Sequence, residues 1–139
     1  MATGTVTVTR IPNVENAADK NIVRRVIIDW ISDDMGDVAY DLDLNGEIVR
    51  VVTVPGAGAN QPDDNYDVTL VDAYGIDVLR SMGTNRDETN TEEFVPYTTD
   101  EVIAMVQEAI FHEYLSGRYT FTVAAAGDTL SGQAVLYLK

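Results

Sequence analysis

The chain of 139 residues lacks cysteine altogether, has a single histidine, and carries 9 lysines and arginines against 23 aspartates and glutamates. Without cysteine it cannot form disulfides, zinc–thiolate sites or a thiol nucleophile, so its fold does not depend on the redox state of its compartment. The net charge of −14 repels phosphate backbones and anionic lipid surfaces. We therefore expect neither nucleic acid nor a membrane as a partner.

Long apolar runs are missing as well. The longest unbroken ones, such as residues 102–106, fall far short of the ~20 residues that a membrane-spanning helix needs. The N-terminal sequence MATGTVTVTR alternates threonine and valine and has no basic stretch followed by an apolar block, so we expect strand structure there and no signal peptide. Hydrophobic residues make up 45% of the chain, which suffices for one core. The prediction is a single domain over residues 1–139.

Most of the remaining pattern has a period of two, which places side chains alternately on the two faces of a β-strand. The segment from Thr3 to Arg10 has the pattern of a half-buried strand near the edge of a sheet. The same criterion predicts strands at residues 24–32, 38–44, 48–54, 66–70, 76–79, 119–123 and 134–138. About eight short strands are typical of an all-β fold, either an antiparallel β-sandwich or a barrel.

Turn-forming residues should join these strands into hairpins. Asn45-Gly46 is the strongest signal, because both residues tolerate the positive φ of a type I′ turn. Residues 72–75 predict a second hairpin through a four-residue turn, and the sequence AAGDTLSG at 125–132 predicts a third. Residues 83–93 are polar and rich in asparagine and threonine, so we expect an exposed loop, a common place for binding surfaces.

The segment near residues 99–115 admits two interpretations. Thr98 and Glu101 have the spacing of a capping box, and the apolar residues that follow have helical spacing, which predicts one helix near residues 99–115. In the second interpretation the helix ends near Glu108 and a strand starts at Ile110, because the residues after it also suit a strand. Either way the fold class stays all-β.

One run of acidic residues imitates a metal site. The sequence Asp41-x-Asp43-x-Asn45-Gly46 matches the first half of a calcium-binding loop, in which alternate oxygens converge on the ion. However, Val52 occupies the position of the bidentate glutamate that would close the loop. Strand alternation with solvated aspartates explains the spacing equally well, so we expect no bound metal.

Catalytic signatures are absent from the sequence. His112-Glu113 begins like a zinc-protease helix, but Ser116 stands where the second histidine should be, and no serine lies in a Gly-x-Ser-x-Gly motif. The glycine-rich residues 55–60 lack the lysine of a phosphate-binding loop. We therefore expect no catalytic residue, no cofactor and no enzymatic activity. Four aromatic residues point to the same side of their strands as the apolar residues and should lie in the core: Trp30, Tyr40, Tyr66 and Tyr119. The alternative is that aromatic residues form a platform on which sugars stack.

Six segments, in this order, carry a family resemblance: TVTVTR, VIIDWISDDMGD, LNGEIVRVVTVPG, DDNYDVTLVDAYGIDVL, GTNRDETNTEE and YTFTVAAAGDTLSGQAVLYLK. They resemble small all-β virion proteins from the structural gene clusters of tailed bacteriophages. The resemblance covers most of the chain except residues 96–116. It implies a non-enzymatic role on the virion, assembled in the host bacterial cytoplasm, as a protein that decorates or cements the capsid. The alternative is a carbohydrate-binding module of a phage tail or baseplate.

The partners implied are the phage capsid or other virion proteins and further copies of the chain. The terminal strands could add to a neighbour's sheet, and the strands at 24–32 and 134–138 are apolar on both faces, although one sheet face buries only one set. We therefore expect a closed homo-oligomer, with a trimer favoured. Arg86 is the one cation in the loop 83–93. The predicted partner-binding residues are Thr5, Val6, Thr7, Val8, Arg86, Val135 and Tyr137.

Overall fold

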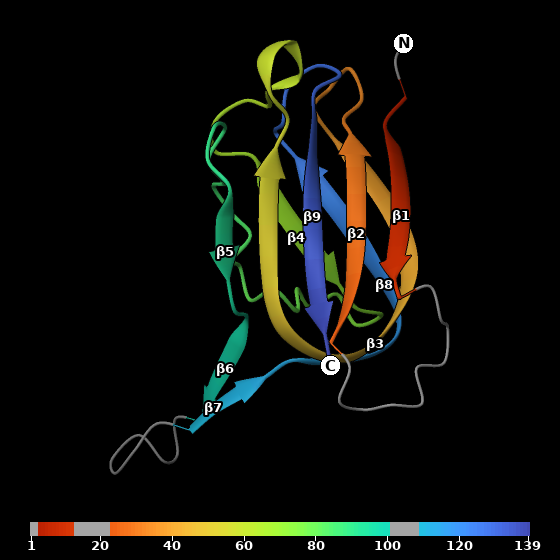
Figure 1. Cartoon of the computed structure of the whole chain (residues 1–139), viewed down its shortest axis with the longest axis vertical. Helices are drawn as coiled ribbons and strands as arrows, with labels where there is room; N and C mark the ends of the chain where they lie inside the picture. Colours follow the sequence, from red (N-terminus) through yellow and green to blue (C-terminus); the bar gives the residue numbers. More distant parts are fainter. Residues whose placement is uncertain (1–2, 13–22, 101–108) are drawn as a thin grey trace.

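A computed structural model describes residues 3–12, 23–100 and 109–139. Within these ranges the chain forms antiparallel strands and one short 3-10 helix, η1 (Gly58–Asn60), which confirms the predicted all-β fold (Figure 1). No helix in the described part is long and apolar enough to cross a membrane. The strands are β1 (Thr5–Ile11), β2 (Arg24–Ile31), β3 (Val38–Pro55), β4 (Asp67–Val71), β5 (Glu92–Phe94), β6 (Tyr97–Asp100), β7 (Ala109–His112), β8 (Tyr114–Ala124) and β9 (Ser131–Leu138).

Seven of the strands form two layers that share β3, and β6 and β7 form a separate two-stranded sheet. In what we call the five-stranded layer, β1 pairs with β2, β2 with β9, β9 with the second half of β3, and that half with β5. In the three-stranded layer, the first half of β3 pairs with β8, and β8 pairs with β4. β1 is an edge strand, as its alternation of threonine and valine predicts.

The hairpin predicted at Asn45-Gly46 is wrong. Both residues continue β3, and they pair with Ser116 and Leu115 of β8. Gly46 has a φ of +121°, which lets the strand bend here and pass from one layer to the other. Residues 38–44 and 48–54 consequently pair with β8 and β9 and not with each other.

The third hairpin is also wrong, because β8 and β9 are not neighbours. β8 lies between β3 and β4, whereas β9 lies between β2 and β3. The connection 125–130 therefore crosses between the two layers. Ser32 fixes this connection: its hydroxyl donates to the carbonyl of Gly127 at 2.6 Å and accepts from the amide of Leu130 at 2.9 Å.

The turn at 72–75 is confirmed, but the strand predicted at 76–79 is wrong, because only a single bridge follows the turn. Asp72 Oδ1 accepts from the amides of Tyr74 and Ile76, which closes the turn, and Val71 then bridges to Asp77. The loop at 83–93 is confirmed up to its last two residues, which begin β5.

The predicted helix near residues 99–115 is wrong at both ends. β6 pairs with β7 from Tyr97↔His112 to Asp100↔Ala109, and β8 begins at Tyr114. The middle of the predicted helix, residues 101–108, lies outside the described residues. The alternative of a strand through Ile110 is confirmed there, because β7 spans Ala109–His112.

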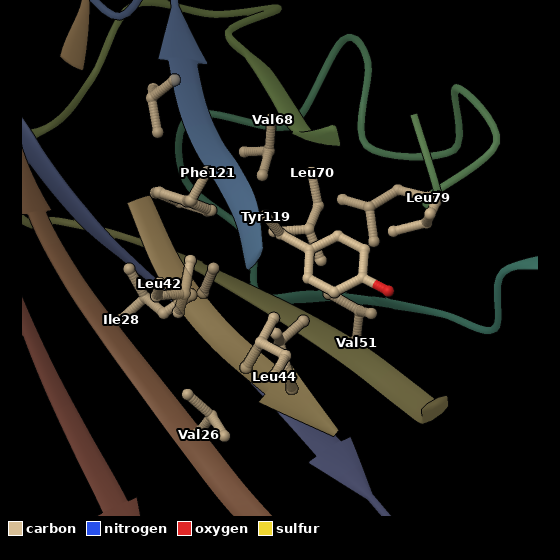
Figure 2. Packing of buried hydrophobic residues seen from close by; sticks show 14 of the residues in the cluster. Val26, Ile28, Leu42, Leu44, Val51, Val68, Leu70, Leu79, Tyr119 and Phe121 are labelled. Atoms are coloured by element: carbon tan, nitrogen blue, oxygen red, sulfur yellow. The ribbon is translucent and has the colours of Figure 1, made fainter. Parts of the chain in front are cut away.

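The core lies between the two layers (Figure 2). Trp30 and Tyr66 are fully buried with ring centroids 5.5 Å apart, and Tyr119 is also buried, as the parity of their strands predicts. Burying one such large side chain stabilises the fold by roughly 1.5–3 kcal/mol. The prediction is wrong for Tyr40, which is 42% exposed because the first half of β3 is an open edge of the three-stranded layer.

Candidate functional site

The outer face of the five-stranded layer carries a row of apolar side chains. Strand register places Ile27 of β2, Val135 of β9 and Val52 of β3 side by side on the face opposite to the core. Val135 lies outside the core cluster, yet only 7% of it is exposed. Its neighbours in the row cover it. No described strand lies over this face, which is turned to the viewer in Figure 1.

Charged residues flank the apolar row on one side. Tyr137 lies between Arg25 and Arg50 in the register, and the guanidinium of Arg50 sits 4.1 Å from the centre of the Tyr137 ring. Arg50 also pairs with Glu93 at 2.6 Å, and this hydrogen bond raises the pKa of Arg50 above its ordinary value. Arg50 and Tyr137 therefore form a cation–π contact on this face.

A depression of about 400 Å³ lies on the other side of the row. Thr5 and Thr7 of β1 line it, and both are exposed. Val6 and Val8 have the opposite parity and pack against the core. Of the predicted partner-binding residues, the structure thus brings Thr5, Thr7, Val135 and Tyr137 onto one face, and it turns Val6 and Val8 away from that face.

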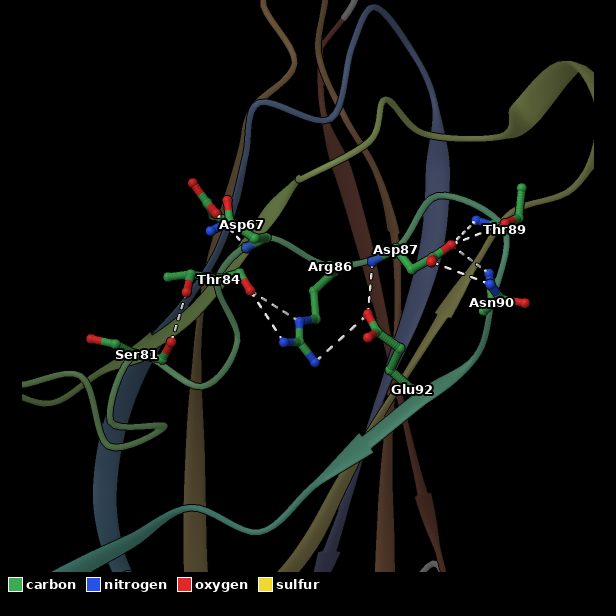
Figure 3. Close-up of polar contacts among 9 residues, drawn as sticks. Asp67, Ser81, Thr84, Arg86, Asp87, Thr89, Asn90 and Glu92 are labelled. Carbon is green, nitrogen blue, oxygen red and sulfur yellow. Dashed lines mark hydrogen bonds and ion pairs between the residues drawn. The ribbon is translucent and has the colours of Figure 1, made fainter.

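Arg86 has a different environment from the other predicted partner-binding residues (Figure 3). Its side chain is 16% exposed and lies 5.1 Å from the centre of the Phe94 ring. Its Nε and Nη2 donate to the carbonyl of Thr84 at 3.3 and 3.2 Å, and its Nη1 pairs with Glu92 at 3.7 Å. These contacts give Arg86 an internal bracing role, and its contact with a partner stays a prediction.

A second feature is a cleft of about 690 Å³ between the edge of β1 and the first half of β3, which we call the arginine cleft. It contains four of the nine basic residues of this acidic chain. Arg10 Nη2 donates to the carbonyl of Asp43 at 2.8 Å, and Arg24 Nη2 donates to that of Asn45 at 2.7 Å. The four arginines that line the cleft are Arg10, Arg24, Arg25 and Arg118.

Sequence reasoning missed the arginine cleft, because its arginines come from three strands up to 108 positions apart. The sequence offered one indication, the small number of basic residues. The whole chain has nine of them, so a group of four in one place stands out. Asp41 and Asp43, the residues of the calcium-like run, line the same cleft. Asp41 accepts a hydrogen bond from Thr120 at 2.7 Å, and Asp43 lies 3.5 Å from Arg118. Within the described ranges no three metal-ligating side chains converge.

The structure thus describes two surface features, the outer face with its apolar row and the arginine cleft. Comparison of the chain with protein-family models, with curated protein sequences and with solved structures found no match. The geometry of the two surfaces is therefore the basis for assigning a function.

Proposed function

We propose that this protein is a non-enzymatic structural component of a tailed-phage virion, which decorates or cements the capsid. We assign the capsid contact to the outer face of the five-stranded layer. The single observation that carries this assignment is the row of Ile27, Val135 and Val52 in the middle of a face that no described strand covers. The virion as its location follows from the family resemblance of the sequence.

The composition of the face supports docking. Burial of apolar area stabilises a contact by roughly 25 cal/mol per Å². The exposed threonines Thr5 and Thr7 and the edge of β1 add hydrogen-bonding groups beside the apolar row. We propose separately that the chain forms a closed homo-oligomer, with a trimer favoured.

The test compares matched lysine substitutions on the two outer faces. Ile27→Lys places a charge in the apolar row, and Thr122→Lys places one at a half-buried position of β8 on the outer face of the three-stranded layer. We expect Ile27→Lys to weaken co-sedimentation with capsids that lack this protein by at least about tenfold, because the charge must be desolvated. Thr122→Lys should change it by no more than about twofold, and circular dichroism should show both variants folded.

Salt provides a second criterion. Docking through apolar contacts should strengthen between about 0.05 and 0.5 M NaCl, because salt screens the repulsion between acidic copies. Equal binding of the two lysine variants, or binding that falls tenfold with salt, would refute the assignment of the capsid contact to this face.

The carbohydrate-binding alternative depends on exposed aromatic residues other than Trp30, because Trp30 is buried in the core. The exposed tyrosines are Tyr40, Tyr74, Tyr97 and Tyr114. A sugar platform needs aromatic rings that lie close together on one surface. This alternative predicts that glycan binding is lost when the exposed tyrosines are replaced.

A further inference from the structure

Charge is distributed unequally between the two ends of the sandwich. The loops at 32–37, 56–66 and 125–130 lie at the end where β2 and β8 finish, and they contain no lysine or arginine (Figure 1). The arginine cleft lies toward the opposite end, where β1 finishes and β2 begins. The acidic loops carry six aspartates: Asp33, Asp34, Asp37, Asp63, Asp64 and Asp128.

The arginine cleft has more basic than acidic side chains in its lining, four arginines against Asp41 and Asp43. Arg10 and Arg24 each use Nη2 on a carbonyl of β3, and a guanidinium has five N–H donors, so further donors remain for a ligand. The side chain of Arg118 is 67% exposed. Two apolar side chains that line the cleft are accessible, Tyr40, which is 42% exposed, and Val8, which is half-buried, whereas Val26 and Leu42 belong to the core. A volume of about 690 Å³ lies within the range of roughly 300–1,000 Å³ that binding sites occupy.

The turn between β2 and β3 has the matching chemistry. Asp33 Oδ1 accepts from the amides of Met35 and Asp37, both at 2.9 Å, which fixes a tight turn. The turn presents Asp34, which is exposed, beside Met35, which is 78% exposed. An unbranched methionine fits irregular apolar cavities, and a carboxylate forms charge-assisted hydrogen bonds with arginine. The rigid turn loses little conformational entropy on binding.

We propose that the Asp34–Met35 turn of one copy docks in the arginine cleft of a second copy. Met35 contacts Val8 and Tyr40, and Asp34 pairs with the arginines of the cleft. The contact joins two different surfaces, so it is heterologous and forms rings or open chains of copies. It does not use the apolar row of the outer face, and its test is therefore independent of the proposed capsid contact.

The electrostatics predict an optimum in salt. At about 0.01 M the Debye length of ~30 Å lets the whole charge of −14 repel a second copy. At ~0.15 M the Debye length is ~8 Å, so local attraction between the turn and the cleft outweighs repulsion between distant charges. At ~1 M the ion pairs themselves are screened. Self-association should therefore be strongest near physiological salt, in contrast to the capsid contact, which strengthens up to ~0.5 M.

Sedimentation velocity of two variants and their mixture tests the contact. Arg118→Asp disables the cleft and Asp34→Arg disables the turn, so each variant alone should self-associate at least about tenfold more weakly than the parent chain at ~0.15 M salt. An equimolar mixture retains one intact turn and one intact cleft, so it should form a one-to-one complex with an affinity close to that of the parent. The charge-matched controls Lys139→Asp and Asp64→Arg should stay within about threefold of the parent.

Three results would overturn the contact. The first is a parent chain that stays monomeric at ~100 μM across the salt range. The second is a mixture of the two variants that does not associate although circular dichroism shows both to be folded. The third is an equal loss of association in the charge-matched controls, which would mean that general charge and not the turn and cleft sets the affinity.

Discussion

The two long edges of the sandwich, where the layers meet solvent, are built differently. At the edge along β4 the backbone is covered by the segment 77–86: the amide of Arg86 donates to Tyr66, that of Val68 to Gly83, and that of Val78 to Leu70, at 2.7–2.8 Å. At the edge between β1 and the first half of β3, two arginine side chains bond to the carbonyls of β3. We call these the covered edge and the open edge.

The difference shows two ways to prevent unwanted strand pairing. A covered edge offers few free backbone groups, whereas an open edge is protected by charged side chains, here arginines, that occupy its carbonyls. Among the described residues, the open edge has the cleft, and its arginines have further N–H donors beyond those bonded to β3. One residue type therefore has two roles: Arg86 braces the covered edge, and Arg118 faces solvent at the open edge.

The largest expected effect comes from removing an arginine from each edge. Arg86→Ala removes two bonds to Thr84 and the pairing with Glu92, all partly buried, and should lower the free energy of unfolding by about 2–3 kcal/mol. Arg118→Ala removes a 3.5 Å pair between two exposed side chains and should cost less than about 0.5 kcal/mol. Urea denaturation of both variants measures the difference, and equal losses would mean that the edges do not differ in this way.

The strand pattern of the chain was predictable because it depends on local alternation. Val26, Ile28 and Trp30 lie in the core, and β1 lies at an edge, as their parity predicts. The pairing of strands was not predictable, because β8 and β9 each find partners far away in sequence. A positive φ at Gly46 suits a hairpin turn or a bend, and only the neighbouring strands decide between them.

The candidate surfaces were predictable to different degrees. The apolar row of the outer face follows from strands that are apolar on both faces, so Val135 and Tyr137 could be named in advance. Arg86 was named because it is a cation in a polar loop, but its contact with Phe94 depends on how the loop folds onto the sheet. The arginine cleft depends on the divergence of β1 from β3, which no local pattern encodes.

A smaller effect concerns one tyrosine at each edge. Burial raises the pKa of Tyr66 from 10.0 to about 12 at the covered edge. The unfolded chain releases this proton above pH 10 and the folded chain keeps it, so the protein should lose on the order of 2 kcal/mol of stability between pH 10 and 12. Tyr66→Phe should abolish that loss and, because the buried hydroxyl has no hydrogen-bond partner among the described residues, should not destabilise the fold at pH 7.

Tyr40 is the matched position at the open edge, where its ring is partly exposed. Tyr40→Phe should leave the alkaline loss of stability unchanged. Thermal melts of the parent and both variants at several pH values between 8 and 12 measure the effect. If Tyr40→Phe removed the loss and Tyr66→Phe did not, the ionising group would lie at the open edge.

The smallest expected effect is a local response to acid at the covered edge. Asp87 accepts from the amides of Thr89 and Asn90 at 2.7 and 2.9 Å, and these bonds lower the pKa of its carboxyl from 3.8 to about 2 (Figure 3). A lowered pKa means that the stabilisation is complete above pH 3.8 and is lost as the pH falls through about 2. Because the carboxylate is exposed, we expect a local opening of the turn and no global unfolding. NMR should show Asp87 titrating near pH 2, together with faster amide exchange at Thr89 and Asn90 below that pH. Asp43→Asn changes a carboxylate at the open edge and should leave this step in place. If the step disappeared in that variant, the titrating group would lie at the open edge and the prediction would be wrong.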